Sequence, residues 1–206
     1  MHRQVMENRR RQTNAERYLP LPDTTRLIEV GDTLTRLSEM FTDLAGARLV
    51  SLEGIGGIGK TALARAFVAL PEVIVNWPVI LWVSARQASL AEDGSLLTVV
   101  DPATTLEDIS IRMAEQLGLT SLSGKPLVER LEGLHSSLAN KKTLVVVDNL
   151  ETIEEHQVLV PALAKLAGLS RFLITTHQRL RGFPFVHTIP LNELSSDEAY
   201  NLMSAE

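Results

Sequence analysis

Apolar residues in this chain of 206 residues concentrate in five short runs, and the segments between them show the spacing of amphipathic helices. The runs cover residues 48–53, 79–83, 143–147, 171–175 and 186–190. The second and third are continuously or almost continuously apolar, as is typical of strands buried on both faces of a parallel sheet. Strands that alternate with helices predict an α/β fold, a three-layer αβα sandwich with a mainly parallel five-stranded sheet.

Helix boundaries are predicted from capping residues and from prolines. One helix is expected over residues 33–45, with Asp32 or Thr33 as its N-cap. Another is expected to begin at Thr104 or Thr105, with an acidic residue three positions on as a capping box. Pro71 is predicted to end the helix that starts near residue 60. Pro161 is predicted to interrupt a helical pair between the third and fourth runs.

The glycine-rich segment after the first run has the spacing of a phosphate-binding loop. Gly54-Ile55-Gly56-Gly57-Ile58-Gly59-Lys60-Thr61 fits the Walker A pattern G-x-x-x-x-G-K-[ST] at every fixed position. The segment follows a predicted strand and precedes a predicted helix, which is the order that the motif needs. A glycine-rich turn that binds nothing is the plainer interpretation, and the flanking strand and helix argue against it.

The residue types in this loop suit a polyphosphate. Glycines allow positive φ and a close approach of the backbone, so that successive N–H groups turn inward toward an anion. The following helix, which includes Ala62, adds the positive end of its dipole. Lys60 supplies a full charge, and the Thr61 hydroxyl can coordinate Mg²⁺. We therefore predict that residues 54–62 bind nucleotide, with Lys60 as a catalytic residue and Thr61 as a metal ligand.

The third apolar run ends in an acid, Leu144-Val145-Val146-Val147-Asp148, which is the pattern of a Walker B motif. At the carboxyl edge of a neighbouring strand, Asp148 is predicted to meet the metal held by Thr61, directly or through water. Asn149 stands where many P-loop ATPases carry a second acid that polarises the attacking water, and an amide cannot act as a base. Glu151 could replace that acid or be a surface residue. We infer slow hydrolysis at most.

Polar residues also follow the fourth run, at the same predicted edge of the sheet. Thr175, Thr176 and His177 offer two hydroxyls and an imidazole that could sense a terminal phosphate. The alternative is a strand end that turns to solvent. Both interpretations stay open for Thr175 and Thr176, which we include among the candidate catalytic residues, whereas an exposed surface position is favoured for His177.

Motif positions divide the chain into three parts. Residues 1–22 are polar and end in a proline-containing extended run, so they are predicted to be an N-terminal extension or linker. Residues 23–190 form the predicted P-loop nucleotide-binding domain, in which residues 86–103 lack a sustained period and are predicted to be a loop or insertion. Residues 191–206 begin a further helical segment that is apparently truncated.

Composition limits the other functional classes. The formal charge of −5 gives no basic footprint for nucleic acid, and the 45% of hydrophobic residues excludes wholesale disorder. The absence of cysteine excludes disulfides, thiolate metal sites and a cysteine nucleophile. The sequence shows neither a transmembrane stretch nor a signal peptide, so we expect a cytoplasmic protein with no direct nucleic-acid or membrane binding.

With these motifs placed, the chain resembles the NB-ARC/STAND class of P-loop NTPases from about residue 27 to residue 203. The matching stretches are SLEGIGGIGKTALA (51–64), VILWVSAR (79–86), LEDISIRMAEQLGL (106–119), TLVVVDNLETI (143–153), RFLITTH (171–177) and IPLNELSSDEAYNLM (189–203). The resemblance implies an adenine-nucleotide switch, operated by ATP and ADP with Mg²⁺, that forms a homo-oligomer when active. Its effector and sensor domains would lie outside this chain.

Two stretches depart from the pattern of the class. A Gly-Arg pair that helps to hold adenine and ribose is replaced here by LIEVGDTL (27–34), in which Leu27, Ile28 and Val30 are predicted to contact adenine. The Thr-Thr-Arg that often senses the γ-phosphate ends in histidine here, and Arg179 or Arg181 could supply the arginine.

Three functions follow from these motifs. The first is an ATP-binding STAND switch module with slow or no hydrolysis. The second is an actively hydrolysing ATPase or a small-molecule kinase, which would need an arginine-rich lid and an evident base. The third is a pseudo-NTPase that acts as an interaction scaffold. A GTPase is disfavoured because residues 140–143, NKKT, lack the aspartate of the guanine-binding N-K-x-D motif and precede the Walker B strand.

Overall fold

The computed structural model describes residues 31–43, 46–85, 88–90, 96–98, 105–150, 156–180 and 182–191. Several predicted features lie outside these residues, namely the N-terminal extension, the adenine contacts of Leu27, Ile28 and Val30, the residues Glu151 and Arg181, and the helical segment after residue 191.

Five strands form one sheet in the order β2-β5-β6-β1-β7, and the pairings between them are parallel. The strands are β1 (Leu49–Glu53), β2 (Val79–Ser84), β5 (Thr143–Asp148), β6 (Arg171–Thr176) and β7 (Val186–Pro190). The five predicted strands are therefore confirmed. The order of the strands corrects the prediction that the strand of Asp148 neighbours the strand that leads into the P-loop. Strand β6 lies between these two strands, β5 and β1.

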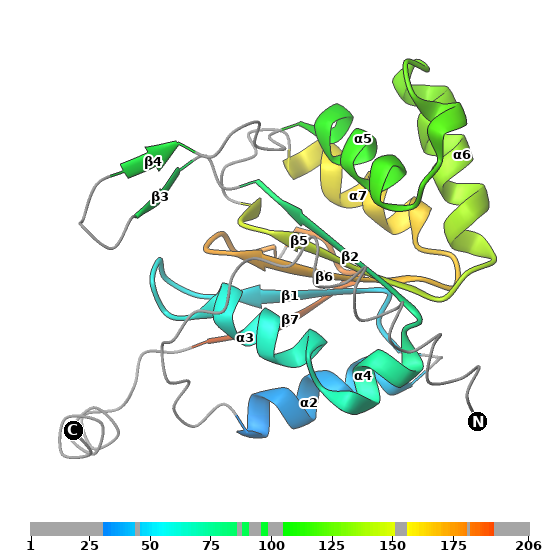
Figure 1. Cartoon of the computed structure of the whole chain (residues 1–206). Helices are drawn as coiled ribbons and strands as arrows, with labels where there is room; N and C mark the ends of the chain where they lie inside the picture. Colours follow the sequence, from blue (N-terminus) through cyan, green and yellow to red (C-terminus); the bar gives the residue numbers. More distant parts are fainter. Residues whose placement is uncertain are drawn as a thin grey trace, which may run out of the picture.

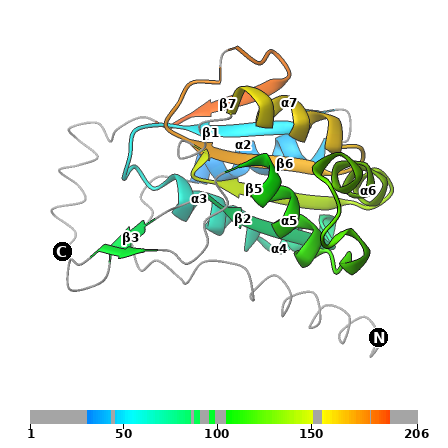
Figure 2. The same ribbon diagram turned by 90° about the horizontal axis from the view of Figure 1, so that it is seen from above.

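Helices cover both faces of this sheet (Figures 1 and 2). One layer holds α2 (Gly31–Thr42), α3 (Lys60–Val68) and α4 (Pro71–Asn76). The other holds α5 (Leu106–Gln116), the short 3₁₀ helix η1 (Thr120–Leu122), α6 (Leu127–Ala139) and α7 (His156–Leu166). The three-layer αβα sandwich is thus confirmed. Within the described part of the chain, every helix is too short or too polar to cross a membrane.

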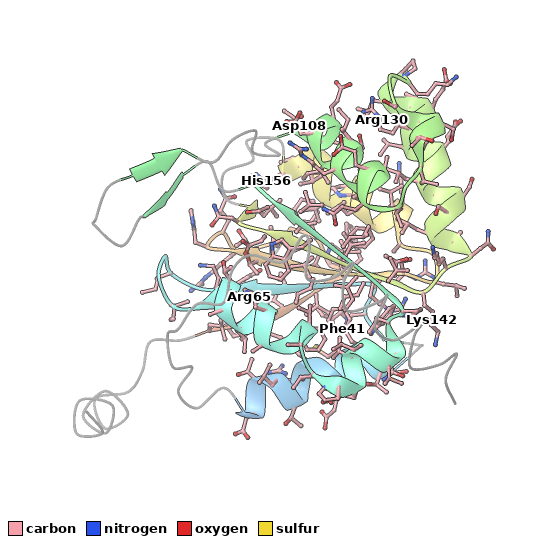
Figure 3. The ribbon with its side chains drawn as sticks, viewed as in Figure 1. Phe41, Arg65, Asp108, Arg130, Lys142 and His156 are labelled. Carbon is pink, nitrogen blue, oxygen red and sulfur yellow. The ribbon has the colours of Figure 1, made fainter. Side chains whose placement is uncertain are left out.

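Successive residues of a central strand pack into opposite layers. In β5, Val145 and Val147 belong to the core under α5, α6 and α7, whereas Leu144 and Val146 belong to the core with α2, α3 and α4. Figure 3 shows Phe41 in this second layer, on α2. This two-sided burial explains the continuous apolar runs in the sequence. It also fixes the layer toward which each polar residue at a strand end is directed.

Several helix predictions are confirmed, and one that rests on proline is wrong. The Thr105 hydroxyl accepts from Asp108 N and the Asp108 carboxylate accepts from Thr105 N, so the capping box of α5 is present. Helix α3 ends at Val68, just before Pro71, as predicted, and Pro71 then begins α4, because proline at the first helical position costs no hydrogen bond. Pro161 lies inside the single helix α7, where Leu159 and Leu163 on either side of it are buried in the core.

Two further boundaries differ from the prediction. Helix α2 begins at Gly31, so Asp32 and Thr33 lie in its first turn and are not its N-cap. The predicted loop over residues 86–103 contains an antiparallel pair, β3 (Ala88–Leu90) and β4 (Leu96–Thr98). Strands of three residues are too short to show a clear alternation in the sequence.

Candidate functional site

The P-loop connects β1 to α3 at the carboxyl edge of the sheet (Figure 1). Gly57 and Gly59 have φ angles of 80° and 94°, in the left-handed region that disfavours other residues. Gly59 is also the N-cap of α3, so no side chain competes with an anion for the first amide groups of the helix. Gly54 and Gly56 do not have positive φ, so two of the four loop glycines use the conformation that glycine favours.

Lys60 is directed into the loop that precedes it. The Lys60 Nζ atom donates to the carbonyl oxygens of Gly54 and Ile55, each at 2.9 Å, and the residue is only 7% exposed. The loop carbonyls therefore hold the ammonium group within the turn that the glycines form. This placement brings a full positive charge to the predicted phosphate site.

Three polar side chains meet beside the start of α3. The Asp148 Oδ1 atom accepts from the Thr61 hydroxyl at 2.8 Å and from the Thr175 hydroxyl at 2.7 Å. Asp148 is 2% exposed and lies at the end of β5, while Thr175 comes from the inserted strand β6. The structure thus brings together Thr61 and Asp148, as the sequence predicted, across the width of one intervening strand.

The chemistry of these groups fits Mg²⁺ better than a softer metal. Within the described ranges, no group of three or more histidine, aspartate and glutamate side chains gathers into a preformed metal site. Asp148 and Thr61 instead offer one carboxylate and one hydroxyl, which are hard oxygen donors. Mg²⁺ is usually bound by one or two protein oxygens together with water and substrate phosphates. A magnesium ion delivered with a nucleotide therefore suits this pair of residues.

Asn149 adopts an unusual backbone conformation directly after Asp148. Its φ angle is 71°, and among non-glycine residues in the described part of the chain it alone has positive φ. Asparagine tolerates this region better than most residues. The turn directs the Asn149 N–H to the Thr175 hydroxyl at 2.9 Å. The Thr175 hydroxyl therefore accepts from Asn149 and donates to Asp148, which ties the ends of β5 and β6 together.

The two candidate threonines at the end of β6 differ in their surroundings. Thr175 contacts Asp148, whereas the Thr176 hydroxyl accepts from Gln178 N at 3.0 Å. Strand alternation places Thr176 on the α7 side of the sheet, with Ile174, and Thr175 on the α3 side. His177 is exposed, as expected. The structure therefore joins Thr175, but not Thr176, to the cluster of Thr61 and Asp148.

Sequence reasoning missed Glu53, the last residue of β1. It is only 6% exposed, and its Oε1 atom accepts from Leu180 N at 2.8 Å. Like Asp148, Glu53 is an acidic residue that ends a buried strand at the carboxyl edge of the sheet, and this pattern in the sequence could have indicated it. Glu53 lies immediately before the P-loop, so its contacts bear on the position of the loop.

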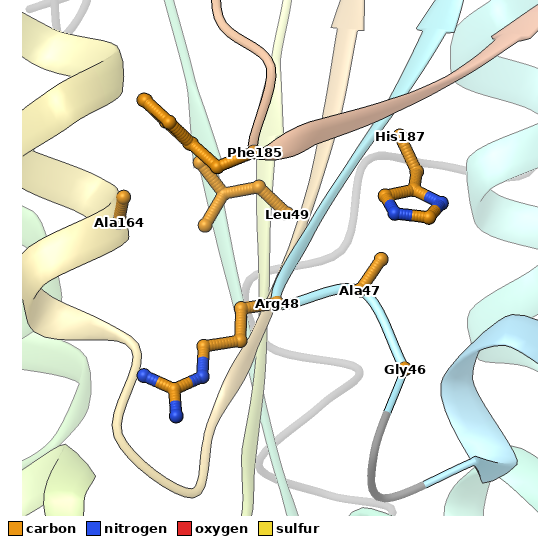
Figure 4. Close-up of a pocket in the computed structure, with 7 residues that line it drawn as sticks. All are labelled: Gly46, Ala47, Arg48, Leu49, Ala164, Phe185 and His187. Atoms are coloured by element: carbon orange, nitrogen blue, oxygen red, sulfur yellow. The ribbon is translucent and has the colours of Figure 1, made fainter.

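A separate hollow of about 400 Å³ lies at the opposite edge of the sheet, near the amino end of β1 (Figure 4). Arg48 and His187 are among the residues that line it. Burial, and then the neighbouring guanidinium of Arg48, lower the pKa of Arg171 at this edge, while Asp43 acts to raise it. Another hollow of about 320 Å³ lies among α5, η1 and α6. Neither hollow is lined by P-loop residues, so both are separate from the candidate site.

Strand, glycine loop and helix, with Lys60 and Thr61 at the loop and Asp148 across the sheet edge, define a P-loop NTPase domain. Within that class, the chain belongs to the NB-ARC domain family, whose model matches residues 29–206. The family match covers the whole described sheet and confirms the resemblance that the motifs indicated.

The chain is also similar to two known proteins. The chain is 26% identical over 137 residues to a putative disease resistance protein of Arabidopsis thaliana, a match that covers 65% of this chain and 11% of the relative. It is similar to the crystal structure of a signal transduction ATPase with numerous domains (STAND), a protein with a tetratricopeptide repeat sensor from Pyrococcus horikoshii. That match has 21% identity and a TM-score of 0.50, and covers 89% of this chain and 26% of the other, so it supports the fold.

Proposed function

We propose that this domain is the ATP/ADP-binding switch module of a STAND-type signalling NTPase, with slow or no intrinsic hydrolysis. The observation that carries the proposal is the 2.8 Å contact between the Thr61 hydroxyl and Asp148, which joins the Walker A and Walker B motifs beside Lys60. The chain spans only 11% of the plant relative and 26% of the archaeal protein. Sensor and effector segments, oligomerisation and a cytoplasmic location therefore belong to the proposal for the whole protein.

Each residue of the site has a role in this proposal. The backbone N–H groups of residues 54–62 surround the phosphates, and the Lys60 ammonium offsets their charge. Thr61 and Asp148 hold Mg²⁺, which neutralises phosphate charge when it is bound. Adenine contacts are assigned to Leu27, Ile28 and Val30. The exposed side chain of Ile55 and the partly buried side chains of Ile58 and Ala62 form the rest of the nucleotide-binding segment.

Slow hydrolysis follows from the groups around Asp148. The Asn149 amide cannot accept a proton from water, and Asp148 Oδ1 already accepts from the Thr61 and Thr175 hydroxyls. A carboxylate engaged in this way, and assigned to a metal, is poorly suited to act as a general base. A switch that holds its nucleotide therefore fits these residues better than a rapidly hydrolysing ATPase.

Thermal unfolding tests the proposal directly. Protein shown to be nucleotide-free is heated with Mg²⁺ alone and then with Mg²⁺ and ATP, ADP or GTP. A ligand at 100 times its Kd adds about 2.7 kcal/mol to the native state, which raises the Tm of a domain of this size by roughly 5–10 °C. We expect such a shift with ATP and ADP and little shift with GTP. No shift with any nucleotide would overturn the proposal.

Changing Asp148 to Asn should remove most of the benefit of magnesium. The amide keeps an oxygen that accepts from Thr61 and Thr175, so the local hydrogen bonds can persist, but the negative charge is lost. We expect the affinity for Mg-nucleotide to fall roughly tenfold, with little change in the affinity measured in EDTA. Isothermal titration with and without Mg²⁺ measures both, and Asp32→Asn, at an exposed position in the first turn of α2, is the matched control. An unchanged magnesium dependence would remove Asp148 from the metal site.

A further inference from the structure

The carboxyl end of β1 is the point where two other segments of the described chain meet the start of the P-loop. Gly54 N donates to the carbonyl oxygen of Thr176, at the end of β6, at 3.3 Å. Leu191 N, just after β7, donates to the carbonyl oxygen of Glu53 at 2.6 Å. A Cβ atom on Gly54 would lie 2.8 Å from the Leu191 carbonyl oxygen, so this close approach needs glycine. Glu53 and Gly54 thus form a junction for both segments.

The Glu53 side chain adds a third attachment at the same junction. Its Oε1 atom accepts from Leu180 N at 2.8 Å and lies 3.1 and 3.2 Å from the hydroxyls of Ser51 and Thr188. A buried carboxylate is costly unless it is well hydrogen-bonded, and this oxygen has three donors from three segments. Ser51 and Thr188 lie in paired strands, β1 and β7, whereas Leu180 belongs to the connection that follows β6. The contact to Leu180 is therefore the one that restrains a connecting segment.

The two ends of the turn over residues 176–180 are consequently attached to Glu53 and Gly54, which are consecutive in the chain. One end is held by the Gly54 N–H and the other by the Glu53 carboxylate. Inside the turn, the Thr176 hydroxyl accepts from Gln178 N. The exposed side chains of His177 and Arg179 lie between the two attachments. The turn follows the same strand that supplies Thr175 to the Asp148 cluster, so it lies at the nucleotide edge of the sheet.

We propose that Glu53 is a positioning residue that holds the turn over residues 176–180 against the P-loop, so that the domain distinguishes ATP from ADP. In this proposal the turn, which follows β6 at the edge of the sheet that carries the P-loop, contacts the γ-phosphate that ATP carries and ADP lacks, and Glu53 acts on that contact through its hydrogen bond with the Leu180 N–H. The inference rests on the proposed nucleotide-binding function. It goes beyond that function by assigning nucleotide discrimination to a buried carboxylate on the face of the sheet opposite to Asp148.

The test compares wild-type protein with Glu53→Ala and Glu53→Gln. Two quantities are measured: the ratio of ATP to ADP affinity in Mg²⁺, and the hydrogen-exchange rate of the Leu180 amide without nucleotide. For Glu53→Ala we expect faster exchange at Leu180 and an ATP-to-ADP affinity ratio about fivefold lower, which corresponds to the loss of one hydrogen bond. Glu53→Gln keeps an acceptor oxygen at the same distance and should restore both values toward wild type. Glu72→Ala, at an exposed position in the first turn of α4, is the control.

The outcomes separate this inference from the proposed function. Wild-type protein that binds neither nucleotide would overturn the proposed function and this inference with it. Wild-type protein that binds both equally, or a Glu53→Ala variant that loses affinity for both by the same factor, would overturn the inference alone. If Glu53→Ala does not fold, Glu53→Asp replaces it, because the shorter side chain withdraws the carboxylate from Leu180 N while keeping its charge. The same lower ratio and faster exchange are expected for it.

Discussion

Lys60→Ala is expected to weaken nucleotide binding by roughly ten- to a hundredfold, because a hydrogen bond from a charged group contributes about 1.5–3 kcal/mol. Nζ donates to the carbonyl oxygens of Gly54 and Ile55 at 2.9 Å, so the ammonium group lies within the predicted phosphate-binding loop. Its removal takes away the charge opposite the phosphates and two contacts that shape the loop. Titration with a fluorescent ATP analogue, and with ADP, measures the change.

Two further variants separate these contributions. Lys60→Met keeps the aliphatic stem, which is nearly buried, and removes only the charged group, so a similar loss of affinity would assign the effect to the charge. Lys165→Ala, at an exposed position in the last turn of α7, removes a lysine remote from the loop and should leave the affinity unchanged. If Lys60→Ala binds as tightly as wild type, the phosphate site is not where the Walker A motif places it.

Much of the fold could be predicted because both faces of the sheet are buried. Runs such as Leu144-Val145-Val146-Val147 contribute alternately to two cores, and this requirement leaves a strong signal in the sequence. The order of the strands leaves no such signal. Strand β6 lies between β1 and β5, and this position follows from long-range packing that periodicity does not report. The prediction that Pro161 interrupts a helical pair was wrong for a similar reason. Core contacts on both sides of Pro161 preserve α7 as one helix.

The candidate site was predictable where a motif fixes spacing, and less so where tertiary contacts decide. The pairing of Thr61 with Asp148 follows from the Walker motifs, and the 2.8 Å contact agrees with it. The different surroundings of Thr175 and Thr176 depend on which layer each one faces, and the insertion of β6 sets Thr175 beside Asp148. Glu53 was not predicted because two of its three partners, the Leu180 amide and the Thr188 hydroxyl, are distant in sequence.

Asn149→Asp is expected to raise the rate of ATP hydrolysis roughly ten- to a hundredfold while leaving nucleotide affinity similar. A positioned general base typically raises the reaction rate by a factor of 10²–10⁴. We expect a smaller increase here, because no other residue is adjusted to the new carboxylate. The backbone favours this substitution, since aspartate, like asparagine, tolerates the left-handed conformation found at φ 71°. The hydrogen bond from the residue 149 N–H to the Thr175 hydroxyl belongs to the main chain and is retained.

Asn149→Glu tests the same idea against the backbone constraint. Glutamate carries the same charge but is less tolerant of positive φ, at a cost of about 1–2 kcal/mol in stability, so it should hydrolyse ATP less effectively than the aspartate variant and unfold at a lower temperature. Asn140→Asp, at the exposed C-cap of α6, makes the same chemical change away from the site and should not alter turnover. Phosphate release at saturating Mg-ATP measures the rates. A rise in both residue 149 variants but not in Asn140→Asp would show that the missing carboxylate limits hydrolysis. No rise in Asn149→Asp would show that the limit lies elsewhere, in groups that the nucleotide meets outside this sheet edge.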